Sequence, residues 1–191
     1  YSGFIAGWKR GLPQVAENPA RLEHVVQLGA GGAGSATAYA LCRLGVRRLS
    51  LFERDAAKAQ ELAEQLGGLF PQTRVEVLTD DERLIEALLQ AQGLVNATPV
   101  GMHVHPGMPL SESALSAGVL REGLWVADVI YLPQQTQLVR AARAAGCEVL
   151  TGGYMAVGQA VDAFRLFTGL EPNAERMAAH FEVLIAAQQG A

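Results

Sequence analysis

Short apolar runs alternate with amphipathic segments along most of the chain. The apolar runs have strand length, and the segments between them carry apolar residues at helical spacing. Strands are predicted at residues 24–28, 48–53, 74–78, 93–96, 124–129 and 148–150. Helices are predicted at residues 2–10, 32–44, 56–66, 81–90, 134–145, 154–167 and 174–188, with a Pro- and Asn-containing connector at residues 12–21.

Most of the predicted strands are mainly apolar and do not alternate strictly with polar residues. Such strands, separated by helices of about ten residues or more, are typical of a parallel sheet that is covered on both faces. Gly45 and Gly146 directly follow the predicted helices 32–44 and 134–145, as C-terminal capping glycines do. Asp55 and Asp80 directly precede the predicted helices 56–66 and 81–90 and can cap them. We therefore expect a doubly wound, Rossmann-like α/β fold with flanking N- and C-terminal helices.

Composition and charge exclude several classes of protein. The 191 residues suffice for one large domain, and the net charge of -4 leaves no basic surplus for binding nucleic acid. The sequence has no apolar run of about 18 residues, so no membrane span is expected. Two cysteines, Cys42 and Cys147, in apolar or helical stretches indicate a reducing compartment. We expect a cytoplasmic protein.

A glycine-rich segment follows the first predicted strand directly and opens an alanine-rich helix. The segment has the spacing G-x-G-x-x-G and consists of Gly29, Ala30, Gly31, Gly32, Ala33 and Gly34. In this context the glycines permit a tight turn, a close approach of the backbone to a pyrophosphate, and close packing of helix on strand. The alternative is a tight glycine turn without a ligand. The strand before and the helix after favour dinucleotide binding.

An acidic residue ends the second predicted strand. Glu53 lies 24 positions beyond Gly29, where a Rossmann fold receives the ribose hydroxyls of the adenosine. It could also be an ordinary exposed strand end, whereas helix capping explains Asp55 fully. Because a carboxylate repels a 2′-phosphate, we expect NAD as the cofactor, with NADP less favoured. Arg54 is included in the predicted cofactor site and is the counterargument, because a guanidinium can bind that phosphate.

Three further segments come after later strands, at the edge of the sheet where such folds bind ligands. They are Asn96-Ala97-Thr98-Pro99-Val100-Gly101-Met102, Asp128-Val129-Ile130-Tyr131-Leu132-Pro133 and Gly152-Gly153-Tyr154-Met155-Ala156-Val157-Gly158-Gln159. Together with the glycine loop they resemble the shikimate/quinate dehydrogenase family, in the order and at the spacing of that family, along nearly the whole chain. The opening Tyr1-Ser2-Gly3-Phe4 is similar to the residues directly after the Asn-Thr-Asp triplet of the family.

This resemblance implies the C-terminal cofactor domain of an NAD(P)-dependent oxidoreductase acting on shikimate or quinate. No catalytic residue is expected within this chain, because the catalytic Lys/Asp pair of the family would lie upstream of Tyr1, in a missing N-terminal substrate domain. The chain alone should then be inactive. Tyr131 and Gln159 would contact the hydroxy acid. The nicotinamide half of the cofactor would be bordered by Asn96, Thr98, Pro99, Val100, Gly101, Met102, Val129, Tyr131, Gly152 and Met155.

The expected organisation has three parts. Residues 1–22 form a linking helix and connector, residues 23–170 the dinucleotide-binding domain, and residues 171–191 a C-terminal helix that packs on that domain. His105-Pro106-Gly107 and Glu53-Arg54-Asp55 resemble the quinate/shikimate branch of the family, but the sequence does not decide between the two substrates. A homodimer is compatible with the sequence.

Two other functions remain open at this stage. One is a dehydrogenase domain like that of glutamyl-tRNA reductase, which shares the glycine loop. The other is a dinucleotide-binding module without catalysis, because a fold does not determine a function. A metal site is not expected, since His103 and His105 stand two apart in a loop without a third ligand.

Overall fold

Six parallel strands form one sheet in the order β3-β2-β1-β4-β5-β6 in the computed structural model, which describes residues 1–189. The strands are β1 (His24–Leu28), β2 (Arg48–Phe52), β3 (Arg74–Leu78), β4 (Gly93–Asn96), β5 (Trp125–Asp128) and β6 (Glu148–Leu150). The chain winds outward from β1 to β3 and then crosses back to β4, which pairs with β1. The carboxyl ends of β1 and β4 therefore flank the point where the strand order reverses, the place where open α/β sheets bind ligands.

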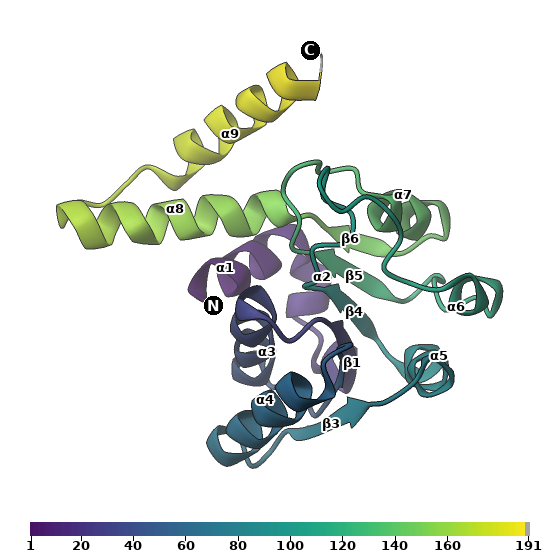
Figure 1. The fold of residues 1–191 in the computed structure, drawn as a ribbon. Coiled ribbons are helices and arrows are strands. Elements are labelled where there is room, and N and C mark those ends of the chain that lie inside the picture. The colour runs from purple at the N-terminus through teal and green to yellow at the C-terminus, as the bar shows by residue number, and fades with distance from the viewer. Residues whose placement is uncertain (190–191) are drawn as a thin grey trace.

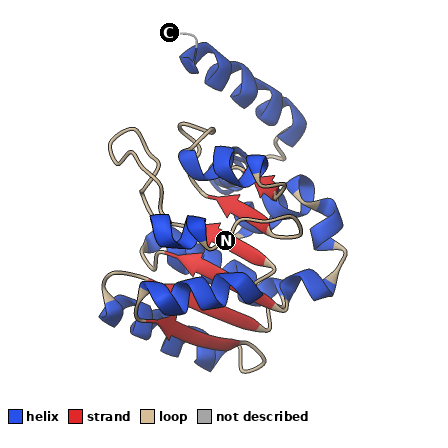
Figure 2. Ribbon diagram, turned by 90° about the vertical axis from the view of Figure 1, so that its right-hand side faces the viewer, coloured by secondary structure: helices blue, strands red, loops and turns tan. Residues whose placement is uncertain are grey.

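Helices cover both faces of this sheet (Figures 1 and 2). They are α1 (Ser2–Gly11), α2 (Pro13–Ala16), the 3-10 helix η1 (Pro19–Leu22), α3 (Gly32–Leu44), α4 (Ala56–Leu69), α5 (Asp81–Gln90), α6 (Glu112–Ser116), α7 (Gln137–Ala144), α8 (Gly152–Thr168) and α9 (Ala174–Gln189). Val25 packs in one core with side chains of α1, α3 and α4, and the next residue, Val26, packs in a second core with α5, α6 and α7. This alternation confirms the doubly wound fold and explains why the strands read as continuous apolar runs.

The predicted strands and the long helices are confirmed, and the capping residues act as expected. Asp80 accepts a hydrogen bond from the backbone N–H of Arg83 at 2.9 Å, and Asp55 accepts one from Lys58 N–H at 3.4 Å. Gly45 ends α3 in the left-handed conformation with φ of 92°. Cys42 and Cys147 are buried free thiols.

Several local predictions were wrong, either because a short helix was missed or because a helix boundary was misplaced, as at the end of α4, which is Leu69 and not Leu66. The connector at residues 12–21 contains α2 and η1, because Pro13 and Pro19 each occupy the first turn of a short helix, where proline is tolerated. Helix α7 begins at Gln137 and not at residue 134, because Thr136 caps it. Helix α8 begins at Gly152 and not at Tyr154. The short helix α6, capped by Ser111, was not predicted.

Helix α8 leaves the sheet and crosses α1 at close range. A Cβ on Gly3 would lie 2.8 Å from the backbone nitrogen of Gln159, and one on Gly158 would lie 2.7 Å from the Cα of Gly3. Larger residues would therefore push the two helices apart. The Ser2 hydroxyl also donates a hydrogen bond to Asp162 on α8. These contacts fix the direction in which α8 projects, and with it the position of Gln159.

Helix α9 runs back over α8 and extends beyond the sheet (Figure 1). Ile185 is buried and Phe181 packs near Gly153, but Leu184 is 51% exposed. The C-terminal end of α8 and the turn after it carry exposed apolar side chains, because Leu166 and Phe167 are 81% and 83% exposed and Leu170 is 65% exposed. None of the helices within residues 1–189 is long and apolar enough to cross a membrane.

A buried polar chain joins β1, β2 and β3. The Ser50 hydroxyl donates to Glu76 at 2.6 Å and accepts from Nε2 of His24 at 2.8 Å, and Arg48 binds the same carboxylate. Burial, with Arg48 nearby, lowers the pKa of His24 to about 4, so its imidazole is neutral at pH 7. This network belongs to the sheet interior and not to the ligand-binding edge.

Candidate functional site

The glycine loop lies between β1 and α3, at the reversal point of the sheet. Gly29 has φ of +94°, and a Cβ there would lie 2.8 Å from the carbonyl oxygen of Ala97 in the loop after β4. A Cβ on Gly34 would overlap the Gly29 carbonyl oxygen and lie 2.8 Å from the carbonyl carbon. Both glycines are thus required by the protein's own packing. By contrast, Gly31 and Gly32 have no neighbour within 4 Å of such a Cβ.

Gln27 holds this loop together from inside the sheet, a role that the sequence did not predict. Its amide Nε2 donates to the carbonyl oxygens of Gly29 and Gly34, each at 2.9 Å, and its Oε1 accepts from the Thr37 hydroxyl at 2.9 Å. The side chain is fully buried. A lone glutamine in an otherwise apolar strand was the available signal, because a buried amide needs such partners.

The N-terminus of α3 can bind an anion. The helix has 13 residues, and its N-cap residue Gly31 offers no side-chain hydrogen bond to the first turn. The N–H groups of that turn carry the positive end of the helix dipole. Since the space beyond Gly31 and Gly32 is open, the residues present fit the pyrophosphate of a dinucleotide.

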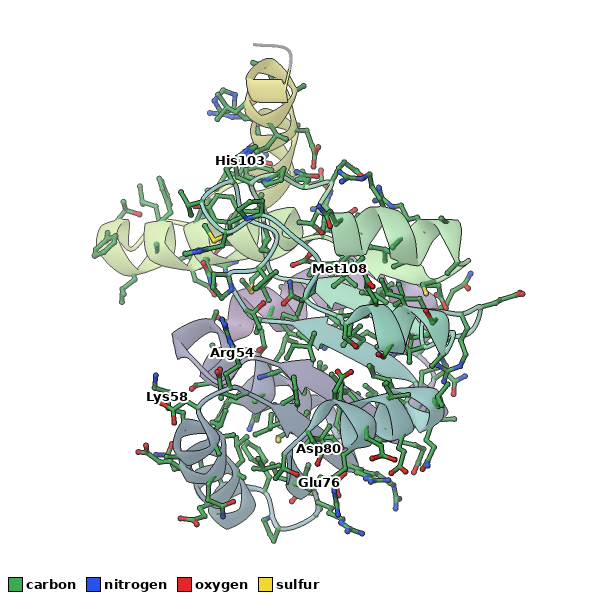
Figure 3. The ribbon with its side chains drawn as sticks, turned by 45° about the vertical axis from the view of Figure 1, so that its right-hand side comes forward. Arg54, Lys58, Glu76, Asp80, His103 and Met108 are labelled. Carbon is green, nitrogen blue, oxygen red and sulfur yellow. The ribbon has the colours of Figure 1, made fainter. Side chains whose placement is uncertain are left out.

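Glu53 directly follows β2 and lies beside this loop, one residue beyond the end of the strand. One carboxylate oxygen accepts a hydrogen bond from the backbone N–H of Ala30 at 2.9 Å, and the other accepts from Asp55 N–H at 3.3 Å. The backbone therefore holds the carboxylate at the loop. Asp55 caps α4 and pairs with Lys58 at 3.3 Å. Arg54 is exposed, and Figure 3 shows it with Lys58 on the α4 side of the molecule.

A cavity of about 450 Å³ adjoins the glycine loop. Ala33 contributes to its wall, and so do the segments after β4 and β5, which the sequence predicted to lie together. The predicted residues that line it are Thr98, Pro99, Met102, Val129 and Tyr131, beside Ala97, His103, Val104, Ile130 and Leu132. The cavity is mostly apolar, as expected of a site that receives an aromatic ring.

The remaining predicted residues lie around this cavity without lining it. Asn96 is completely buried. Gly101 has φ of +117° and packs on Ile130, and Gly152 packs so closely on the segment after β5 that its Cβ would lie 2.6 Å from the Ile130 carbonyl carbon. Met155 packs against the core on the α1 side. Asn96, Gly101 and Gly152 thus shape the backbone around the cavity, whereas Met155 contacts the core instead.

Tyr131 stands between two cavities. It is 51% exposed, so it is not the buried aromatic that was the alternative interpretation. Besides the cavity just described, it lines a second one of about 580 Å³ together with Gln159, His180 and apolar residues of α8 and α9. Tyr131 and Gln159 thus line the same cavity, although 28 positions separate them in sequence.

No group of three or more potential metal ligands occurs within residues 1–189. His103 and His105 are exposed in the loop after β4, and Figure 3 shows His103 at the same end of the molecule as α8 and α9. Within residues 1–189, no third potential metal ligand therefore forms a group with these two imidazoles.

Comparison with known proteins places this geometry among dehydrogenases. Residues 154–180 match the model of the shikimate 5′-dehydrogenase C-terminal domain. The chain is 54% identical over 189 residues to a shikimate dehydrogenase (NADP(+)) of Arthrobacter sp. (strain FB24), covering 99% of this chain and 61% of the relative. It is 47% identical over 176 residues to a quinate/shikimate dehydrogenase (NAD(+)) of Corynebacterium glutamicum (strain R), covering 92% and 58%.

A solved structure has the same fold. It is a quinate dehydrogenase from Corynebacterium glutamicum in complex with NAD, which superimposes with a TM-score of 0.84 at 45% identity, over 95% of this chain and 61% of that one. The chain therefore spans about three fifths of the length of these relatives.

Proposed function

We propose that this chain, which is similar to shikimate and quinate/shikimate dehydrogenases over nearly its whole length, is the nicotinamide-dinucleotide-binding part of an oxidoreductase that acts on shikimate or quinate. The observation that carries this proposal is the uncapped glycine loop beside Glu53, which opens onto an apolar cavity. The cofactor, when bound, supplies hydride transfer to or from the secondary alcohol carbon of the hydroxy acid.

The residues of this chain would bind and orient the reactants. The first turn of α3 would hold the pyrophosphate, and Glu53 would accept hydrogen bonds from the adenosine ribose. The cavity next to the loop, with Thr98 and Met102 in its wall, would receive the nicotinamide end and keep water away from it. Tyr131 and Gln159 would form one wall of the substrate site.

The remaining wall, and the proton transfer, would come from a separate domain. The relatives are longer than this chain, and the apolar side chains Leu166, Phe167 and Leu170 at the α8–α9 turn are 65% to 83% exposed. Exposed apolar patches of this kind are typical of interfaces. We propose that an N-terminal substrate domain packs on α8 and α9 and completes the site, so that α9 contacts both domains.

The two other functions have less support. A glutamyl-tRNA reductase-like domain would share the glycine loop, but the match of residues 154–180 to the shikimate 5′-dehydrogenase C-terminal domain favours the proposed function. A cofactor-binding module without catalysis would not need the second cavity, in which Tyr131 and Gln159 meet.

This function predicts that the 191-residue chain binds NADH but does not oxidise quinate or shikimate. The glycine loop is complete, whereas the proposed proton-transfer groups lie outside the chain. Binding is measured by calorimetric titration and turnover by the absorbance of NADH, with a preparation of the Gly31→Ala variant as the control for contaminating dehydrogenase. Turnover by the wild type that the variant lacks would contradict the proposed division of labour.

A further inference from the structure

We propose that Asp128 is a positioning residue that fixes the three loops around the nicotinamide end of the site, an inference that rests on the proposed function. Asp128 is the last residue of β5 and is 2% exposed. It lines neither cavity that contains Tyr131, so it would act through its neighbours and not on a ligand.

The carboxylate of Asp128 accepts hydrogen bonds from three different segments. Oδ1 accepts from the side-chain amide of Asn96 at 3.1 Å and from the backbone N–H of Ile130 at 3.1 Å. Oδ2 accepts from the Thr136 hydroxyl at 2.7 Å. One buried side chain thus joins the end of β4, the loop after β5 and the start of α7.

Asn96 links Asp128 to Thr98, which lines the cavity of about 450 Å³. Its Oδ1 accepts hydrogen bonds from the backbone N–H of Thr98 at 3.1 Å and from the Thr98 hydroxyl at 2.7 Å. Its Nδ2 donates to the Val100 carbonyl at 3.2 Å as well as to Asp128. Since Thr98 lines the cavity and Asn96 does not, Asp128 sets the place of Thr98 through Asn96.

Thr136 supports the same loop from the other side. Its hydroxyl caps α7 by accepting from Val139 N–H at 3.1 Å while it donates to Asp128. A Cβ on Gly101 would lie 3.3 Å from the Thr136 Cβ, so the loop after β4 rests on this residue. Asp128 therefore supports the loop after β4 in two ways. Its hydrogen bond to Asn96 fixes Thr98, and its hydrogen bond to Thr136 fixes the residue on which Gly101 packs.

The carboxylate is suited to this role because every partner is a donor. Asn96, Ile130 and Thr136 each present an N–H or O–H to it, and an ionised carboxyl accepts without donating. Burial raises the pKa of Asp128 to about 6, while these three hydrogen bonds oppose that rise. An amide in its place would have to turn an NH₂ group toward one of the donors.

The test compares NADH with ADP-ribose, which lacks the nicotinamide. We expect Asp128→Asn to weaken NADH binding by about ten-fold, the effect of one lost charge-assisted hydrogen bond, and to leave ADP-ribose binding within about two-fold of the wild type. Ser50→Ala, which removes a buried hydroxyl far from these loops, is the matched control and should change neither affinity. If Asp128→Asn does not fold, Thr136→Val should show the same difference.

The outcomes separate this inference from the proposed function. A wild type that binds neither ligand would contradict the proposed function itself. A wild type that binds both, with variants that weaken both equally or neither, would overturn the role of Asp128 alone. Equal affinity of the wild type for NADH and ADP-ribose would also overturn it, because the cavity would then not hold the nicotinamide.

Discussion

Replacement of single glycines in the loop after β1 is expected to separate folding from cofactor binding. Gly34→Ala should lower the free energy of unfolding by about 2 kcal/mol or more, as overpacking of a close contact does, because the new Cβ would overlap the Gly29 carbonyl. The same displacement of α3 from the loop should abolish measurable NADH binding.

Two neighbouring substitutions complete this prediction. Gly31→Ala should leave stability unchanged, since its φ of -72° suits alanine and its Cβ meets open space, yet it should weaken NADH binding by about ten-fold or more by occupying the place of the pyrophosphate. Gly32→Ala should likewise leave stability unchanged, because its Cβ also meets open space. Thermal unfolding measures the stability of each variant, and calorimetric titration measures its affinity for NADH. Normal NADH affinity in Gly31→Ala would show that the pyrophosphate does not approach this loop.

Glu53 is expected to decide between NAD and NADP in a protein that joins this chain to the proposed substrate domain. At about 4 Å, a carboxylate and one phosphate charge repel by about 1 kcal/mol in water and about 4 kcal/mol at the effective dielectric of a protein surface. Glu53→Gln keeps the acceptor for the Ala30 N–H but removes this charge. The ratio of kcat/KM with NADP to that with NAD should therefore rise by about five-fold to several hundred-fold.

Asp55 provides the matched control. Its carboxylate is engaged by the helix cap and by Lys58, and asparagine caps a helix equally well, so Asp55→Asn should shift the ratio only a few-fold. The exposed Arg54 acts in the opposite direction, and relatives named for each cofactor are known. A wild type that prefers NADP, or a shift produced by Asp55→Asn and not by Glu53→Gln, would contradict the role of Glu53.

The sequence predicted those parts of the molecule that local patterns determine. The strands buried on both faces read as continuous apolar runs, and Asp80 and Gly45 marked helix ends through backbone chemistry of their own neighbourhoods. The start of α7 was misplaced because Gln134 and Gln135 are good helix formers, and only the hydrogen bonds of Thr136 set the boundary.

The parts that were missed depend on contacts between distant residues. The buried side chain of Gln27 donates a hydrogen bond to the Gly34 carbonyl, and the buried carboxylate of Asp128 accepts one from Asn96, which is 32 positions away. Sequence spacing could bring Asp128 to the ligand-binding edge but could not reveal that its carboxylate points inward. The separation of the site into two cavities with Tyr131 between them likewise requires the three-dimensional course of α8 and α9.

The central claim is tested most directly by assaying the longer protein that contains this chain for reduction of NAD and NADP in the presence of quinate and of shikimate. We expect NADH formation with at least one of the two acids, and higher kcat/KM with NAD than with NADP, because the glycine loop and Glu53 lie together at the end of the sheet. Absence of dehydrogenase activity with both acids and both cofactors, in a protein that is folded and binds NADH, would contradict the proposed function and would favour a binding module without catalysis.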